Sequence, residues 1–444
     1  MQDLISSDAP LLLHGLEDHP QRTVVAGELH ARPFETFTAP LRASHLAMLG
    51  SDAATDRAHV ARLCEALDQR APREGATHHS VELGSFRLRW ERHTEFSTYT
   101  FFITDYTAYG PEPFDVVALD KVPEAWLAAI GGRMIAGVHL ALEAASRPER
   151  GVHEIIEMFR TPNVAGSRVA DGGALVFTDF RLHGDGFGRL LVQDRGLPPM
   201  RTGRLVQRLL EIETYRLIAL LAFPLARSAS PELNAIEQRL QVITDRMAGE
   251  CALEEQQGLL DEIAGLASEL ARASAARNYR LSAARAYHSI VMHRIRALRE
   301  DRLSGLQTIG EFMDRRFTPA MHTCQSVVDR QEALSRSLAR ATDLLRTRVD
   351  VALERQNRDL LASMNRRTDL QLRLQQTVEG LSVVVISYYS AGLLHFLLKG
   401  LAAGGVAINV ELTMGLTVPV LVLGIFFGIR AMRRRLMRQP PTDS

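Results

Sequence analysis

Two apolar stretches near the C-terminus decide the fold: GLSVVVISYYSAGLLHFLL at residues 380–398 and LTMGLTVPVLVLGIFFGI at residues 412–429. Neither stretch contains Asp, Glu, Lys or Arg, and His395 is the only side chain in them that titrates near neutral pH. A helix needs roughly 20 apolar residues to cross the hydrocarbon core of a bilayer. The pair therefore predicts a transmembrane hairpin at residues 380–429, with the lipid bilayer as a partner.

The flanking charges predict the orientation of this hairpin. Arginines are concentrated before the first stretch, at residues 366–373, and after the second, at residues 430–438. The loop at residues 399–411 carries only Lys399 and Glu411 as charged residues. Basic flanks stay in the cytoplasm. We therefore expect a membrane protein with both termini cytoplasmic and a basic tail at residues 430–444. The first thirty residues contain no signal-peptide pattern.

Composition limits the class of protein. The 444 residues, 46% of them hydrophobic, are enough for two or three domains with a sizeable core. Fifty-two basic residues balance 52 acidic ones, so no nucleic-acid partner is expected. The three cysteines lie far apart without CxxC spacing, which argues against a disulfide framework or a thiolate zinc site.

Residues 1–201 mix strand and helix signals. Phe86, Leu88 and Trp90 alternate with charged residues, and a second alternating run covers residues 99–103, so the two predict a β-hairpin. Further strands are expected at residues 133–142, 174–181 and 187–193, and helices at residues 54–69 and 124–130. This pattern predicts a cytoplasmic α+β domain with a mainly antiparallel sheet, and a parallel doubly wound sheet is the alternative.

Strand signals disappear after residue 201. Residues 202–319 read as antiparallel helical arms, with one helix ended by Pro224 and the next begun by Ser230 as cap and Pro231 in its first turn. Residues 320–379 contain neither Pro nor Gly and predict one long stalk helix that continues into the first membrane span.

Two stripes with a seven-residue spacing run along this stalk. One consists of Leu353, Leu360, Leu374 and Leu381, with Arg367 breaking the series, and the other of Asn357, Met364, Gln371 and Val378. A seven-residue repeat predicts coiled-coil packing against other helices. The partner helices are either the preceding arms or copies of the same stalk, and the second choice predicts a homo-oligomer.

Several segments are similar to those of a known family. They are HPQRTVVAGELHARPF (19–34), LRWERHTEFSTYTFF (88–102), GRLVQRLLEIETYRLIALL (203–221), LLRTRVDVALERQN (344–357) and QLRLQQTVEGLSVVVISYYSAGLL (371–394). With them the chain resembles a bacterial family of uncharacterised membrane-anchored proteins, defined only as a domain of unknown function. The resemblance covers nearly the whole chain. It implies a membrane anchor but no reaction, ligand or catalytic residue.

The order of segments also resembles the CorA-type magnesium channels, which are pentamers with a central pore. Their Gly-Met-Asn signature is absent, because residues 400–405 read GLAAGG. If the protein is such an oligomeric transport protein, the stalk and the first membrane helix line the pore, with Asn357, Met364, Gln371 and Ser387 facing it. A ring of Glu411 carboxylates could attract divalent cations, although a lone glutamate in an outer loop is also compatible with simple solvation.

A second set of candidates lies in the N-terminal domain. Glu28, His30 and Arg32 alternate along one face of an extended segment and could hold a metal or an anionic ligand. Glu91 and His93 lie at the predicted hairpin turn and could complete such a site. The alternative for all five is a polar loop network of ion pairs.

Sequence motifs do not indicate an enzyme. A glycine-rich phosphate loop, a nucleophile elbow and an HExxH motif are all absent, so no cofactor is expected. Two functions remain: an oligomeric CorA-like cation channel or transporter, and a membrane-tethered cytoplasmic scaffold or ligand-binding regulatory protein.

Overall fold

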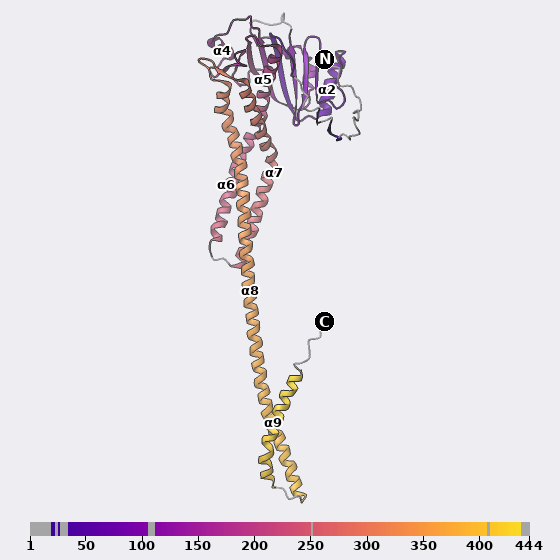
Figure 1. Cartoon of the computed structure of the whole chain (residues 1–444), viewed down its shortest axis with the longest axis vertical. Helices are drawn as coiled ribbons and strands as arrows, with labels where there is room; N and C mark the ends of the chain where they lie inside the picture. Colours follow the sequence, from indigo (N-terminus) through magenta and orange to yellow (C-terminus); the bar gives the residue numbers. More distant parts are fainter. Residues whose placement is uncertain are drawn as a thin grey trace, which may run out of the picture. The chain divides into compact units, whose positions relative to one another are not determined.

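The computed structural model describes residues 19–22, 25–26, 34–104, 112–249, 252–405 and 409–436. The chain divides into two compact units. The first comprises Met1–Gly249 with Asp261–Thr342, and the second comprises Glu250–Leu260 with Asp343–Ser444. The described strands all belong to the first unit, where they form one sheet (Figure 1).

This sheet has nine strands in the order β2-β3-β4-β1-β5-β8-β7-β6-β9. The strands are β1 (Leu41–Leu49), β2 (His78–Glu82), β3 (Arg87–Arg92), β4 (Phe96–Ile103), β5 (Arg133–Glu143), β6 (Ala165–Val169), β7 (Ala174–Thr178), β8 (Gly188–Asp194) and β9 (Asp301–Arg302). Strand β1, which lies inside the sheet between β4 and β5, was not predicted from the sequence.

The sheet is mixed, which corrects the expectation of a mainly antiparallel one. Strands β5 and β8 run parallel, with Val138 opposite Gly188, whereas β1 is antiparallel to both of its neighbours. Between β5 and β8 the chain passes through α4 (Val152–Phe159) and the β6–β7 hairpin. A parallel pair needs a long crossover connection of this kind. The alternation of side chains along a strand contains no information about its direction.

The predicted hairpin at residues 86–103 is confirmed. Strands β3 and β4 are antiparallel, with Trp90 opposite Tyr99. Phe86, Leu88 and Trp90 are buried, together with Tyr99 and Phe101, in one apolar cluster. The alternating apolar residues of both strands therefore face one core.

Helices cover both faces of the sheet. On one face, α2 (Ala53–Ala66), the 3-10 helix η3 (Ala118–Lys121) and α3 (Glu124–Ala128) contribute to the cluster around Trp90. On the other, Ile218 of α5 (Pro199–Leu220) packs against Ala47 and Phe96. The side chains of β3 and β4 that alternate with the apolar ones therefore face a helix rather than solvent.

Long helices follow the sheet: α6 (Ala222–Met247), α7 (Leu253–Leu298), α8 (Ile309–Ala403) and α9 (Val410–Leu436). As predicted, α8 passes through residue 380 without a break. The expected cap at Ser230 is wrong, because Pro231 lies inside α6 and the Ser230 hydroxyl donates to the Ala226 carbonyl at 3.2 Å. An internal proline removes one helical hydrogen bond, which the packing of α6 tolerates.

Two of these helices, α8 and α9, are long and apolar enough to cross a membrane by length and composition. The most apolar part of α9 buries nothing within the chain. Phe396 of α8 is 74% exposed and Leu416 of α9 is 75% exposed. Residues 406–408, between the helices, lie outside the described residues.

Candidate functional site

A row of polar side chains crosses three neighbouring strands on the face covered by α5. Arg89 of β3 lies opposite Thr100 of β4, and Thr100 lies opposite His45 of β1. Two residues further along β3, Glu91 lies opposite Thr98 of β4. Cross-strand partners point to the same face of a sheet, so β1, β3 and β4 together present one polar surface.

Helix α5 provides the opposite wall. Gln207, Glu211 and Thr214 recur at helical spacing and therefore share one side of the helix. Gly203, one turn earlier, allows the chain at residue 35 to cross α5 closely, since a Cβ on this glycine would lie 1.6 Å from the Glu35 carbonyl oxygen. The close crossing positions the start of α5 over the sheet.

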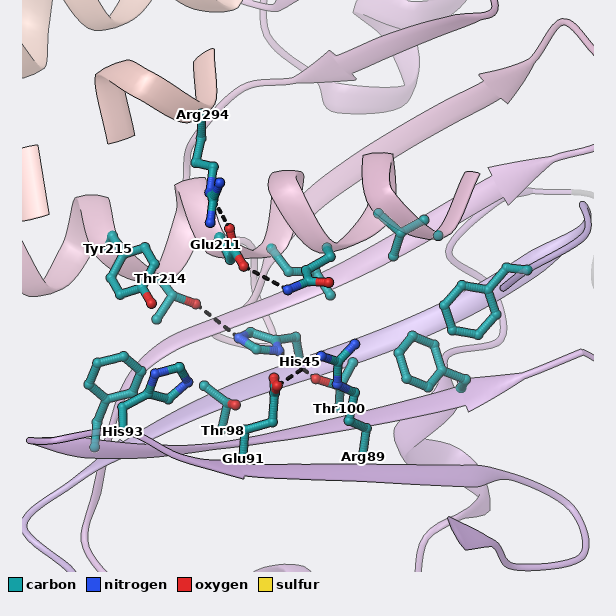
Figure 2. Close-up of a pocket in the computed structure, with 17 residues that line it drawn as sticks. His45, Arg89, Glu91, His93, Thr98, Thr100, Glu211, Thr214, Tyr215 and Arg294 are labelled. Atoms are coloured by element: carbon teal, nitrogen blue, oxygen red, sulfur yellow. Dashed lines mark hydrogen bonds and ion pairs between the residues drawn. The ribbon is translucent and has the colours of Figure 1, made fainter. Parts of the chain in front are cut away.

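Sheet and helices enclose a cavity of about 250 Å³ (Figure 2). Its polar and aromatic lining includes His45, Arg89, Glu91, His93, Thr98, Thr100, Gln207, Glu211, Thr214, Tyr215 and Arg294. Apolar side chains, among them Phe102, Val206 and Leu210, complete the wall. Concave sites with a few convergent polar groups are typical of small-molecule binding.

His45 lies at the centre of the cavity wall. Its Nδ1 is 2.7 Å from the Thr100 hydroxyl and its Nε2 is 2.9 Å from the Thr214 hydroxyl, so the ring links the sheet to α5. Burial, and secondarily the positive charge of Arg89, lower the pKa of His45 from 6.5 to about 3. The imidazole is therefore neutral at physiological pH.

The charged groups of the cavity are paired with each other. Arg89 donates to Glu91 at 2.8 Å, on the sheet side. Arg294, from α7, lies 2.5 Å from Glu211, which also accepts a hydrogen bond from Gln207 at 2.8 Å. Figure 2 shows both pairs at the border of the cavity. The two guanidinium groups and the two carboxylates balance.

The Thr98 hydroxyl takes part in neither the hydrogen bonds nor the ion pairs of this network. Its side chain lines the cavity and is 3% exposed, and its hydroxyl has no hydrogen-bond partner among the described residues. A buried hydroxyl without a partner costs about 1–3 kcal/mol. Such a group facing a cavity indicates a place where a ligand atom can bind.

The structure places two of the five predicted ligand-binding residues in this cavity, Glu91 and His93. Glu28, His30 and Arg32 lie outside the described residues. No group of three His, Cys, Asp or Glu side chains that could hold a metal occurs within the described ranges. His45, Thr98 and the α5 residues were missed, and the one available signal was a histidine in the middle of the run LRASHLAML at residues 41–49.

The predicted pore-lining residues lie on α8 and α9. Asn357, Met364 and Gln371 are exposed along α8, and Glu411 is exposed at the start of α9. Ser387 is 7% exposed, and its hydroxyl has no hydrogen-bond partner among the described residues. In the single chain four of the five positions are therefore open and Ser387 is covered.

A Ser–His–Asp arrangement occurs on the other face of the sheet. The Ser44 hydroxyl is 2.7 Å from His139 Nδ1, and His139 Nε2 is 3.7 Å from Asp185. In serine hydrolases the serine bonds Nε2 and the aspartate bonds Nδ1, which is the reverse. Ser44 is fully buried and also accepts from the Leu119 backbone N–H. The arrangement is therefore a packing network of the sheet.

This fold combines an α/β domain that contains a preformed polar cavity with long helices and an apolar C-terminal helix. The model of the family described as "Protein of unknown function (DUF3422)" matches residues 17–436, and the chain belongs to this family. No curated protein and no solved structure, of a channel or of any other kind, matches the chain.

Proposed function

We propose that the protein is a membrane-anchored receptor that binds a small molecule in the cavity between α5 and the sheet. The observation that carries this proposal is the Thr98 hydroxyl, which is buried in the cavity wall without a partner among the described residues. The surrounding hydrogen bonds and ion pairs hold the other polar groups in place, so the site is organised before a ligand arrives.

The apolar helices supply the anchor in this proposal. A helix whose apolar side chains find no cover in its own chain needs lipid or another protein around it. The ends of α8 and α9 meet this description. We infer that they form a transmembrane hairpin in the bacterial inner membrane, with the arginine-rich flanks and both termini in the cytoplasm.

A fragment screen on the full-length protein in lipid nanodiscs tests the binding function. We expect ligand-observed NMR to detect small polar compounds whose signal is lost in Thr98→Leu, which fills the cavity. Thr94→Leu is the matched control, because Thr94 is exposed four residues away in the turn between β3 and β4. A screen without binders, or binders that Thr98→Leu does not affect, would contradict the proposal.

Conduction of cations by a homo-oligomer is the second candidate, and one observation favours it. Leu353, Leu360, Leu374 and Leu381 are 40–67% exposed and follow a seven-residue spacing along α8 that Arg367 interrupts once. This spacing is the one that self-association through parallel helices requires. Flux of a divalent-cation dye into liposomes tests it: the channel function predicts flux that decreases when Glu411 is replaced by Ala.

A further inference from the structure

Among the described residues that line it, the cavity between α5 and the sheet has its arginines and glutamates in ion pairs. Arg89 is held by Glu91, and Arg294 is held by Glu211. His93 stacks on Phe96, with ring centroids 4.3 Å apart. An anion or a cation would meet charges that are already neutralised by a neighbour, so it would lose hydration without gaining a full counter-charge. A ligand without net charge avoids this cost.

The same cavity offers a hydrogen-bond donor and an acceptor side by side. A neutral imidazole has one N–H and one lone pair. The threonine hydroxyl that accepts from the N–H of His45 keeps its own proton for a ligand, while the hydroxyl that donates to the lone pair keeps its acceptor sites. Thr100 and Thr214 occupy these two positions, and both line the cavity. When the His45 proton moves to the other ring nitrogen, Thr100 and Thr214 exchange the roles of donor and acceptor toward the ligand.

The size of the cavity restricts the ligand further. Its volume of about 250 Å³ lies below the ~300–1,000 Å³ usual for pockets that hold drug-sized ligands, which suits one ring with a short substituent. The free Thr98 hydroxyl adds a third hydrogen-bonding group to the polar wall.

We propose that the ligand is a small uncharged molecule with an amide-like edge, in which a donor and an acceptor lie next to each other. Primary amides and lactams of one ring belong to this class. This inference rests on the proposed function, because it names the ligand class of the same cavity.

Three probes of nearly identical shape test the class: benzamide, benzoate and benzamidinium. Binding to the full-length protein in nanodiscs is measured by ligand-observed NMR titration. We expect benzamide to bind at least about tenfold more tightly than either ion. Benzoate or benzamidinium binding as tightly as benzamide would overturn the inference. So would a broad fragment screen that finds ligands only among charged compounds, an outcome that leaves the proposed function intact.

Benzamide binding is also measured in the Thr98→Val variant. Thr94→Val, outside the cavity, is the matched control. Loss of one hydrogen bond worth about 0.5–1.5 kcal/mol predicts two- to tenfold weaker benzamide binding in Thr98→Val and unchanged binding in the control. Equal affinities of the two variants would contradict a contact between the amide and Thr98. Absence of every ligand in the broad screen would instead contradict the proposed function itself.

Discussion

Replacing two threonines on one face of β4 by valine should change the free energy of unfolding in opposite directions. The Thr98 hydroxyl has no partner among the described residues, whereas the Thr100 hydroxyl is bonded to His45 at 2.7 Å. Thr98→Val removes an unsatisfied polar atom and should raise the free energy of unfolding by about 1 kcal/mol. Thr100→Val leaves a nitrogen of His45 without its partner and should lower it by about 1 kcal/mol.

Tryptophan fluorescence is suited to this measurement. The two tryptophans of the chain, Trp90 and Trp126, both belong to the apolar cluster of the sheet, so their emission reports the unfolding of this region in the full-length protein. If urea titrations show that both valine variants change the free energy of unfolding in the same direction, the proposed difference between the two hydroxyls is wrong.

The neutral state of His45 predicts acid sensitivity. Its pKa is about 3 in the folded protein and 6.5 in the unfolded chain. The unfolded chain therefore binds the extra proton below pH 6.5, and stability decreases by about 1.4 kcal/mol per pH unit as the pH falls from 6.5 towards 3. His139, whose pKa is likewise lowered to about 3 by burial, adds an equal slope.

Replacement of His45 by Gln should remove the contribution of this imidazole, up to about 1.4 kcal/mol per pH unit below pH 6.5, while His59, His79, His139 and His288, whose pKa values are also lowered, keep theirs. The readout is the slope of the free energy of unfolding against pH, so a general loss of stability does not interfere. His153→Gln is the matched control, because the His153 side chain is 90% exposed. A wild-type slope in His45→Gln would contradict a buried neutral imidazole at this position.

At the scale of elements, the position of α5 depends on one glycine. A Cβ at position 203 would lie 1.6 Å from the Glu35 carbonyl oxygen, so the segment at residue 35 or the helix must move. We expect Gly203→Ala to lower the free energy of unfolding by about 3 kcal/mol, the upper end of the usual cost of overpacking.

Gly265→Ala is the matched control for this change. Gly265 also lies in a helix, α7, but its Cβ would meet open space. Alanine there should be neutral or stabilise by up to about 1 kcal/mol. Thermal unfolding followed by far-UV circular dichroism and tryptophan emission compares the two variants, and equal midpoints would show that α5 does not cross the segment at residue 35 closely.

At the scale of the whole molecule, the arginine-rich flanks predict the topology. Reporter fusions after Ser444 should be active only as cytoplasmic reporters, and reporters inserted in the loop at residues 399–411 only as periplasmic ones. The wild-type chain should stay in the membrane pellet after alkaline carbonate extraction. A periplasmic signal at Ser444 would rule out the hairpin.

The sequence by itself determined the features that depend on local spacing. The β3–β4 hairpin follows from alternation of apolar and polar residues, and the continuity of α8 follows from a long run without proline or glycine up to residue 380. The same local pattern placed Glu91 and His93 beside a turn, and both line the cavity. Such features need only the geometry of a strand or a helix.

Only the tertiary structure decided the cavity and the parallel pair β5–β8. Strand β1 is buried over almost its whole length on both faces, so it lacks the alternation by which a strand is recognised. The polar residues of β3 and β4 alternate as if they faced solvent, yet α5, more than a hundred residues later, covers them. Thr98 and His45 acquire their roles from this non-local packing, because burial decides which polar groups must find a partner.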